Sequence, residues 1–70
     1  MRTLIEKLLT DPLWEHYSGK RYTVKMVTNQ MAKDPKKYPP TVVYQSVDTG
    51  MLWSRPVSDW ERSFKIVEID

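Results

Sequence analysis

The residues best suited to chemistry lie in the segment GMLWSRPVSDW, residues 50–60. This segment holds two of the three tryptophans of the chain, Trp53 and Trp60, on either side of Arg55. A guanidinium donates a fork of hydrogen bonds that fits a phosphate or a carboxylate, and an aromatic ring stacks on another flat ring. In the functional interpretation, Arg55 binds an anion while Trp60 or Tyr44 stacks on the ring of the same ligand.

A structural role is the alternative for the same segment. Trp53 and Arg55 alternate along an expected strand, so their side chains share one face of it. A core position for Trp53 leaves Arg55 at the edge of the core, paired with an acid such as Asp59 or Glu61. On this view Trp53 closes the fold, and both Arg55 and Trp60 lie near its rim. The sequence leaves the two interpretations open.

A second group of candidate residues surrounds the turn at Gly19. His16 and Tyr17 precede this glycine, and Lys20 follows it. In one interpretation His16 hydrogen-bonds to the backbone and fixes the turn. In the other it contacts a ligand, flanked by Tyr17 and Lys20. We expect Gly19 to adopt a positive φ angle, which glycine tolerates without steric cost.

Catalysis is not expected from this chain. A lone histidine without a partner nucleophile is weak support for an enzyme, and the acidic residues are dispersed at no recognised ligand spacing. The two glycines cannot form a phosphate-binding loop. The absence of cysteine and the single histidine exclude a disulfide framework and disfavour a structural zinc site. We therefore predict a protein that is not an enzyme and needs neither a cofactor nor a metal.

The length of 70 residues indicates one small domain. A chain of this size buries only about 60% of the surface that it exposes when unfolded, and small folds usually need an additional source of stability. Dense packing of three tryptophans, four tyrosines and one phenylalanine is one source. Self-association is the other, so we predict a homo-oligomer.

The charge balance is mild. Eleven basic and nine acidic residues give a net charge of +2, so nucleic acid is not an expected partner. No apolar run approaches the roughly 20 residues that cross a bilayer. The charged residues Glu6 and Lys7 interrupt the N-terminal apolar segment, so it is not expected to be a signal peptide. We predict a cytoplasmic protein without membrane contact, in the host cytoplasm if a phage encodes it.

The first half of the chain predicts one helix and one strand. Thr3 and Glu6 fit a capping box, and leucine and isoleucine then recur at helical spacing over residues 4–10. The apolar stripe of this helix, which includes Leu8, packs on the rest of the domain or on another subunit. Residues 20–28 predict a strand, in which Tyr22, Val24 and Met26 share one face.

Residues 29–40 predict an irregular loop, because the segment NQMAKDPKKYPP contains three prolines. Its lysines, Lys33, Lys36 and Lys37, lie beside Tyr38. Such a run is usually a solvated loop surface. The functional alternative is a flexible lid or an anion-attracting rim over a neighbouring pocket.

The second half predicts strands over residues 41–47, 51–55 and 64–69. A tight connection at residues 48–50 joins the first two, and Ser58 with Glu61 fits a second capping box, which predicts a single helical turn. The fold class is therefore mainly β: a small SH3-like antiparallel barrel with a short N-terminal helix and a one-turn helix before the last strand. Residues 1–13 form the helical extension and residues 14–70 the barrel.

Three motifs add a resemblance to a known family. In chain order they are His16-Tyr17-x-Gly19-x-x-Tyr22, Val42-Val43-Tyr44 and Leu52-Trp53-x-Arg55-Pro56. Together they resemble the bacterial and phage family known as domain of unknown function 1653, over about residues 14–70. The resemblance implies a small SH3-like barrel. It implies a fold rather than an activity, because the general function of the family is not established.

Three hypotheses of function follow. The first is an oligomeric binding module for a small anionic, ring-bearing ligand, either a nucleotide or a nucleotide-derived signal, as in a phage protein that sequesters a signal of bacterial immunity. The second is an SH3-like module that tethers or inhibits a host protein. The third is weak binding of nucleic acid by the lysine-bearing loop. The candidate ligand-binding residues are Arg55, Trp60, Trp53, Tyr44, His16, Tyr17 and Lys20.

Overall fold

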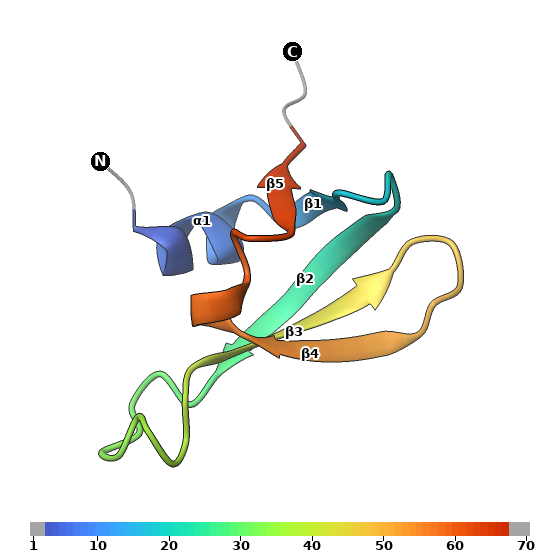
Figure 1. Ribbon diagram of the computed structural model, residues 1–70. Helices are drawn as coiled ribbons and strands as arrows, with labels where there is room; N and C mark the ends of the chain where they lie inside the picture. The colour runs from blue at the N-terminus through green and yellow to red at the C-terminus, as the bar shows by residue number, and fades with distance from the viewer. Residues whose placement is uncertain (1–2, 68–70) are drawn as a thin grey trace.

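The computed structural model describes residues 3–67 as one sheet of five strands, one helix and one 3₁₀ turn (Figure 1). In chain order the elements are α1 (Leu4–Thr10), β1 (Leu13–His16), β2 (Arg21–Thr28), β3 (Thr41–Ser46), β4 (Leu52–Pro56), the 3₁₀ turn η1 (Val57–Asp59) and β5 (Phe64–Ile66). The strand order in the sheet is β4-β3-β2-β1-β5, and every neighbouring pair is antiparallel. Strand β5 thus returns to pair with β1 after the 3₁₀ turn. These elements confirm the predicted mainly-β fold class.

The helix α1 begins and ends as predicted. The side chain of Thr3 accepts a hydrogen bond from the backbone N–H of Glu6 at 3.2 Å, which satisfies one free donor of the first turn. The helix stops before Asp11 and Pro12, because a residue that precedes proline avoids the helical region. Leu8 is buried in the core of the same chain and Leu4 packs against that core, whereas Leu9 is exposed, so part of the apolar stripe packs on its own domain.

Strand β1 was not predicted. Its four residues lie between β2 and the edge strand β5, where Trp14 is opposite Tyr22 of β2 on one side and Ile66 of β5 on the other. The indole N–H of Trp14 donates a hydrogen bond of 2.6 Å to the carbonyl of Asp11. A segment this short carries no clear periodicity. Its extended conformation depends on pairing with β2 and with β5, which is distant in sequence, and this is why the sequence did not indicate it.

The prediction of which β2 side chains share a face of the sheet is only half correct. A shift of register between Val24 and Met26 marks a bulge in this strand. A bulge adds one residue on one strand, so the residues beyond it exchange faces. Val27 is therefore buried in the core, whereas Met26, which was predicted to share a face with Val24, is exposed.

The connection from β4 to β5 also departs from the prediction. The 3₁₀ turn is present, but Pro56 occupies its N-cap and no side chain caps it, so the predicted capping box of Ser58 and Glu61 is wrong. Strand β5 ends at Ile66, and residues 68 and 69 of the predicted strand lie outside the described residues.

Trp60 forms the centre of the core. Its side chain is 0% exposed and stacks on the ring of Phe64, with centroids 3.9 Å apart and ring planes within 3°. Trp14 and Tyr44 meet it edge-on at centroid distances of 5.6 and 5.1 Å. The predicted position of Trp60 at the rim is therefore wrong. Pro56 ends β4, and the 3₁₀ turn that follows directs this tryptophan inward over the sheet.

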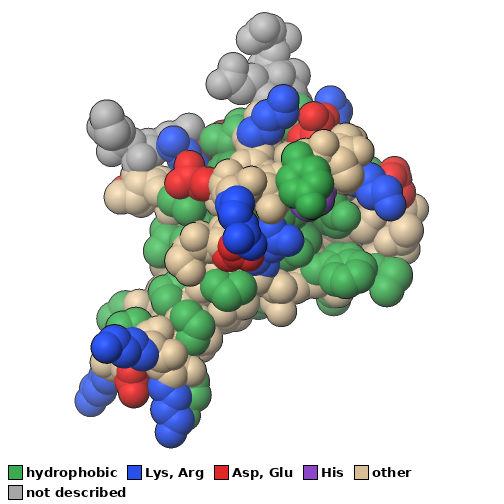
Figure 2. All heavy atoms as spheres, viewed as in Figure 1, with side chains coloured by type: hydrophobic (Ala, Val, Ile, Leu, Met, Phe, Trp, Pro, Cys, Tyr) green, Lys and Arg blue, Asp and Glu red, His purple; other side chains and the backbone are tan. Residues whose placement is uncertain are grey.

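The loop of residues 29–40 contains neither helix nor strand, as predicted, and projects beyond the end of β2 and β3 (Figure 1). Asn29 enters it with a φ of 62° and donates a side-chain hydrogen bond to the carbonyl of Pro39. Asp34 accepts hydrogen bonds from the backbone N–H groups of Lys36 and Lys37. Basic side chains gather at the far end of this projection (Figure 2).

Candidate functional site

Residues from three segments of the chain meet on one surface beside the β1–β2 turn. The ring of His16, at the end of β1, lies 4.1 Å from the ring of Tyr17 and 6.4 Å from that of Tyr22 on β2. Tyr22 in turn lines a shallow cavity of about 100 Å³ together with Lys20 and with Trp53 of β4. We call this continuous surface the aromatic face. The sequence predicted His16, Tyr17 and Lys20 as one group of site residues and Trp53 as part of another, but not that the two groups adjoin.

Arg55 lies at the inner border of the aromatic face. Its guanidinium carbon is 5.1 Å from the centroid of Phe64, close enough for a cation–π contact. Its Nε atom is 4.0 Å from Oδ2 of Asp59, but Asp59 has a much closer partner in Arg62, at 2.6 Å. The expected pair of Arg55 with Asp59 is thus present but long.

One nitrogen of Arg55 is left without a partner. The side chain is only 23% exposed, and its Nη1 atom is buried and makes no hydrogen bond. A buried donor that is left unpaired costs about 1–3 kcal/mol, more when it is charged. Such an atom is therefore a candidate contact for an anion that enters the site.

The exposed rings of the site are not those that the sequence indicated first. Tyr44 and Trp53 are opposite each other in the register of β3 and β4, so their side chains share a face of the sheet. Tyr44 is buried under Trp60 and Phe64, whereas Trp53, on the edge strand, is 49% exposed. Tyr44 and Trp60 are thus covered in this structure, and the predicted core position of Trp53 is wrong. Tyr17, at 81% exposed, is the second open ring.

His16 fixes the turn that follows it. Its Nδ1 atom accepts a hydrogen bond from the backbone N–H of Ser18 at 3.2 Å and lies 2.9 Å from the Ser18 hydroxyl. Gly19 has a φ of 91°, as predicted. The structural interpretation of His16 is therefore confirmed. Its ring nevertheless forms part of the aromatic face, because Tyr17 and Tyr22 pack around it.

The pKa of His16 is lowered from its ordinary value of 6.5. The main cause is burial, which disfavours the charged ring, and the positive charges of Arg55 and Lys20 lower the pKa further. Arg55 and Lys20 are thus both near enough to His16 for their positive charge to disfavour its protonation.

Because the pKa of His16 is lowered, we predict that this histidine makes the stability of the folded chain depend on pH. The unfolded chain binds a proton on His16 more readily than the folded chain, so its contribution is present above the ordinary pKa of 6.5 and is lost as the pH falls below it. We expect the urea midpoint of unfolding to fall between about pH 7.5 and about pH 5.5. In the control, His16→Asn, an amide oxygen replaces Nδ1 as acceptor for Ser18, and this fall should be much smaller. An equal fall in both proteins would contradict the assignment.

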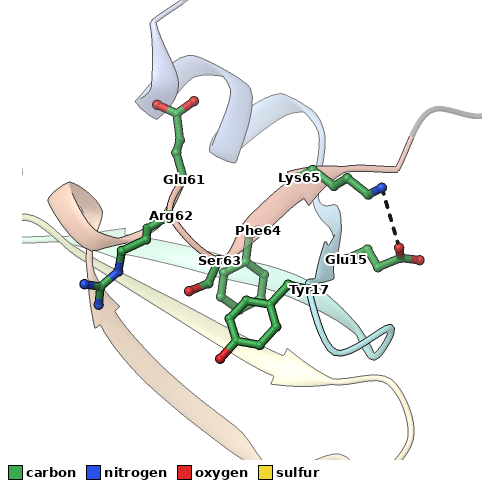
Figure 3. Close-up of a pocket in the computed structure, with 7 residues that line it drawn as sticks. All are labelled: Glu15, Tyr17, Glu61, Arg62, Ser63, Phe64 and Lys65. Carbon is green, nitrogen blue, oxygen red and sulfur yellow. Dashed lines mark ion pairs between the residues drawn. The ribbon is translucent and has the colours of Figure 1, made fainter.

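A wider groove of about 370 Å³ adjoins Tyr17 on its other side (Figure 3). Its floor contains Phe64, and its rim carries charges of both signs, with Lys65 4.0 Å from Glu15. The residues that line it are Glu15, Tyr17, Glu61, Arg62, Ser63, Phe64 and Lys65. Sequence analysis singled out only Tyr17 in this groove, because β1 and β5 become neighbours only through the pairing of the sheet.

The lysine-bearing loop lies at the opposite end of β2 from the β1–β2 turn. Strand β2 spans Arg21–Thr28, which corresponds to about 25 Å at the usual rise per residue. Lys33, Lys36 and Lys37 therefore do not form a rim over His16 and Tyr17.

Within residues 3–67, no group of three or more His, Cys, Asp or Glu side chains could hold a metal ion. Nor does any helix among these residues have the length and apolarity needed to cross a membrane.

A family model, "Protein of unknown function (DUF1653)", matches residues 12–70. The chain belongs to this family. No curated protein and no solved structure matches the chain. The family description names no activity, so the geometry of the aromatic face must support any proposal of function. Of the residues that carry the family resemblance in the sequence, five lie on or beside this face, whereas Val42 and Tyr44 are buried in the core. The five are His16, Tyr17, Tyr22, Trp53 and Arg55.

Proposed function

We propose that the protein is a non-enzymatic binding module whose aromatic face takes up a small anionic ligand with a flat ring, such as a nucleotide. One observation carries the proposal: the buried Nη1 atom of Arg55 has no partner, on a surface that also exposes the rings of Tyr17 and Trp53. A phosphate oxygen at Nη1 would satisfy this donor with a charge-assisted hydrogen bond.

The remaining groups of the face suit the same ligand. Stacking of a base on an aromatic side chain is worth about 1–3 kcal/mol, and Tyr17 and Trp53 each offer an open ring. Arg55 and Lys20 both lower the pKa of His16, so both place positive charge where a phosphate would lie. The neutral imidazole of His16 does not repel a ligand ring that packs beside it.

The test is isothermal titration of the protein with cyclic dinucleotides, cyclic trinucleotides and ADP-ribose derivatives, which include nucleotide-derived signals of bacterial immunity. We expect at least one member of the panel to bind more tightly than about 100 µM, which corresponds to roughly −5.5 kcal/mol. Failure of every member to reach this affinity would contradict the proposal.

A protein-interaction module is the second candidate, and the small volume of the cavity beside Trp53 favours it. Buried small molecules usually occupy cavities of about 300–1,000 Å³, whereas the cavity beside Trp53 measures about 100 Å³. The apolar side chains of Met51 and Leu52 adjoin it along the chain and are exposed. A pull-down from bacterial lysate that yields one stoichiometric protein, lost on Trp53→Ala, would favour this candidate over the nucleotide ligand.

A further inference from the structure

Strand β4 has one free edge. Among the described strands it pairs only with β3, so it ends the sheet on that side. The carbonyl of Met51 accepts a hydrogen bond from Ser46, and the N–H of Val57 donates one to Pro40, both at 2.9 Å. These groups point toward β3.

Because the hydrogen-bonding groups of successive strand residues point in opposite directions, the free edge of β4 can be assigned residue by residue. The odd-numbered residues Met51, Trp53 and Arg55 direct their backbone groups toward β3. The even-numbered residues Leu52, Ser54 and Pro56 direct theirs outward. Pro56 has no N–H, so it offers only its carbonyl.

The free edge of β4 carries little that would prevent pairing with another strand. Natural edge strands are usually blunted by charged side chains, lysine above all, by proline or by very short length. The other edge strand, β5, follows this rule, since it is three residues long and exposes Lys65. On β4, proline occurs only at the last position, Pro56, whereas Leu52 is 63% exposed, Ser54 is also exposed, and neither of these two is charged.

We propose that two copies of the chain associate through antiparallel pairing of their β4 strands about a two-fold axis at Ser54. This register pairs Ser54 with Ser54 of the second copy, and the two residues exchange a reciprocal pair of backbone hydrogen bonds. On each side of the axis the N–H of Leu52 donates to the carbonyl of Pro56 of the second copy. The missing N–H of Pro56 ends the ladder there and limits it to this short pairing.

The side chains of β4 are self-complementary in this register. Trp53 and Arg55 are each one residue from Ser54, so Trp53 of each copy is directly opposite Arg55 of the other. A guanidinium beside an indole is a favourable cation–π pair. On the opposite face of the sheet, the exposed side chain of Leu52 meets the ring of Pro56. An isologous interface needs this kind of match between one patch and itself.

Pairing in this register would also combine the two aromatic faces. The two Arg55 side chains lie diagonally across the axis, so an anion between them relieves their mutual repulsion. This last step rests on the proposed function. The pairing of the strands does not, because the backbone groups of Leu52, Ser54 and Pro56 are free with or without a ligand.

The test is sedimentation equilibrium of the unliganded protein up to about 1 mM, where even a small interface associates measurably. We expect a mass that rises from the 8.3 kDa of one chain toward twice that value. Ser54→Lys places two like charges opposite each other at the axis and should weaken the dimer at least about tenfold. Met31→Lys adds the same charge in the projecting loop, far from β4, and should leave association unchanged.

A charge-swap experiment tests the register itself. Ser54→Lys and Ser54→Glu should each be monomeric, and an equimolar mixture should form a heterodimer, because the lysine of one copy then lies opposite the glutamate of the other. Only a pairing that places Ser54 against itself predicts this rescue. A wild-type monomer at about 1 mM, a dimer that survives Ser54→Lys, or a mixture that stays monomeric would each overturn the proposal.

Discussion

Replacing Trp60 with alanine should remove a large part of the stability of the domain, whereas the same replacement of Trp53 should remove little. The Trp60 side chain is fully buried and stacked on Phe64, and Trp14 and Tyr44 pack on its edges. Truncation of a buried tryptophan costs about 3–5 kcal/mol. A chain of this length has a total stability of roughly 4–10 kcal/mol. Trp60→Ala therefore removes a third of that stability or more, and at the lower end all of it.

The matched control is Trp53→Ala. The indole of Trp53 is 49% exposed on an edge strand, so its loss should cost only about 1 kcal/mol. Both variants are compared with the wild type by urea unfolding followed by far-ultraviolet circular dichroism, at about 5 µM protein, which limits any contribution from self-association. A loss of stability from Trp53→Ala as large as that from Trp60→Ala would show that the two tryptophans had been assigned to the wrong positions.

Replacing Arg55 with methionine should stabilise the domain while it abolishes binding of the anion. Methionine keeps the contact with the Phe64 ring through its thioether and removes the buried, unpaired Nη1 donor. The donor costs about 1–3 kcal/mol, and the cation–π contact that is lost contributes about 0.5–1 kcal/mol. A net gain of about 1 kcal/mol is therefore expected in urea unfolding.

The same variant has a second readout at His16. Arg55 is one cause of the lowered pKa of His16, so Arg55→Met should move that pKa back toward 6.5. Arg62→Met is the control, because Arg62 is exposed, pairs with Asp59 and is not among the causes of the lowered His16 pKa. Destabilisation by Arg55→Met together with an unchanged His16 pKa would mean that Arg55 serves the core and not a ligand.

Local patterns predicted the elements of the fold. The cap at Thr3, the prolines of the projecting loop and the β-branched residues of β3 act over a few residues, and each is found where it was expected. The position of β1 depends instead on pairing with strands on both sides. The bulge in β2 reverses the facing of Met26, and no pattern within the strand indicated it.

The sequence pointed to residues of the candidate site, but it did not predict which of their side chains are exposed. Trp53, Arg55, His16 and Tyr17 were selected because aromatic and cationic groups lay near one another in sequence. Which tryptophan is buried depends on the direction of the chain after Pro56, and the 3₁₀ turn there directs Trp60 inward. Once Trp60 fills the core, Trp53 at the sheet edge remains half exposed. This reversal is a tertiary effect and could not be deduced from spacing alone.

The most direct test of the binding proposal is nuclear magnetic resonance of the three tryptophan indoles and the His16 ring during titration with each member of the nucleotide panel. For the member that binds, we predict that the Trp53 indole signal moves and that the pKa of His16 rises, because a bound anion offsets the positive charge of Arg55 and Lys20. The signals of Trp14 and Trp60 should stay fixed, since both are buried in the core. An unchanged Trp53 signal and an unchanged His16 pKa with every nucleotide at about 5 mM, where even millimolar binding is detected, would contradict the account.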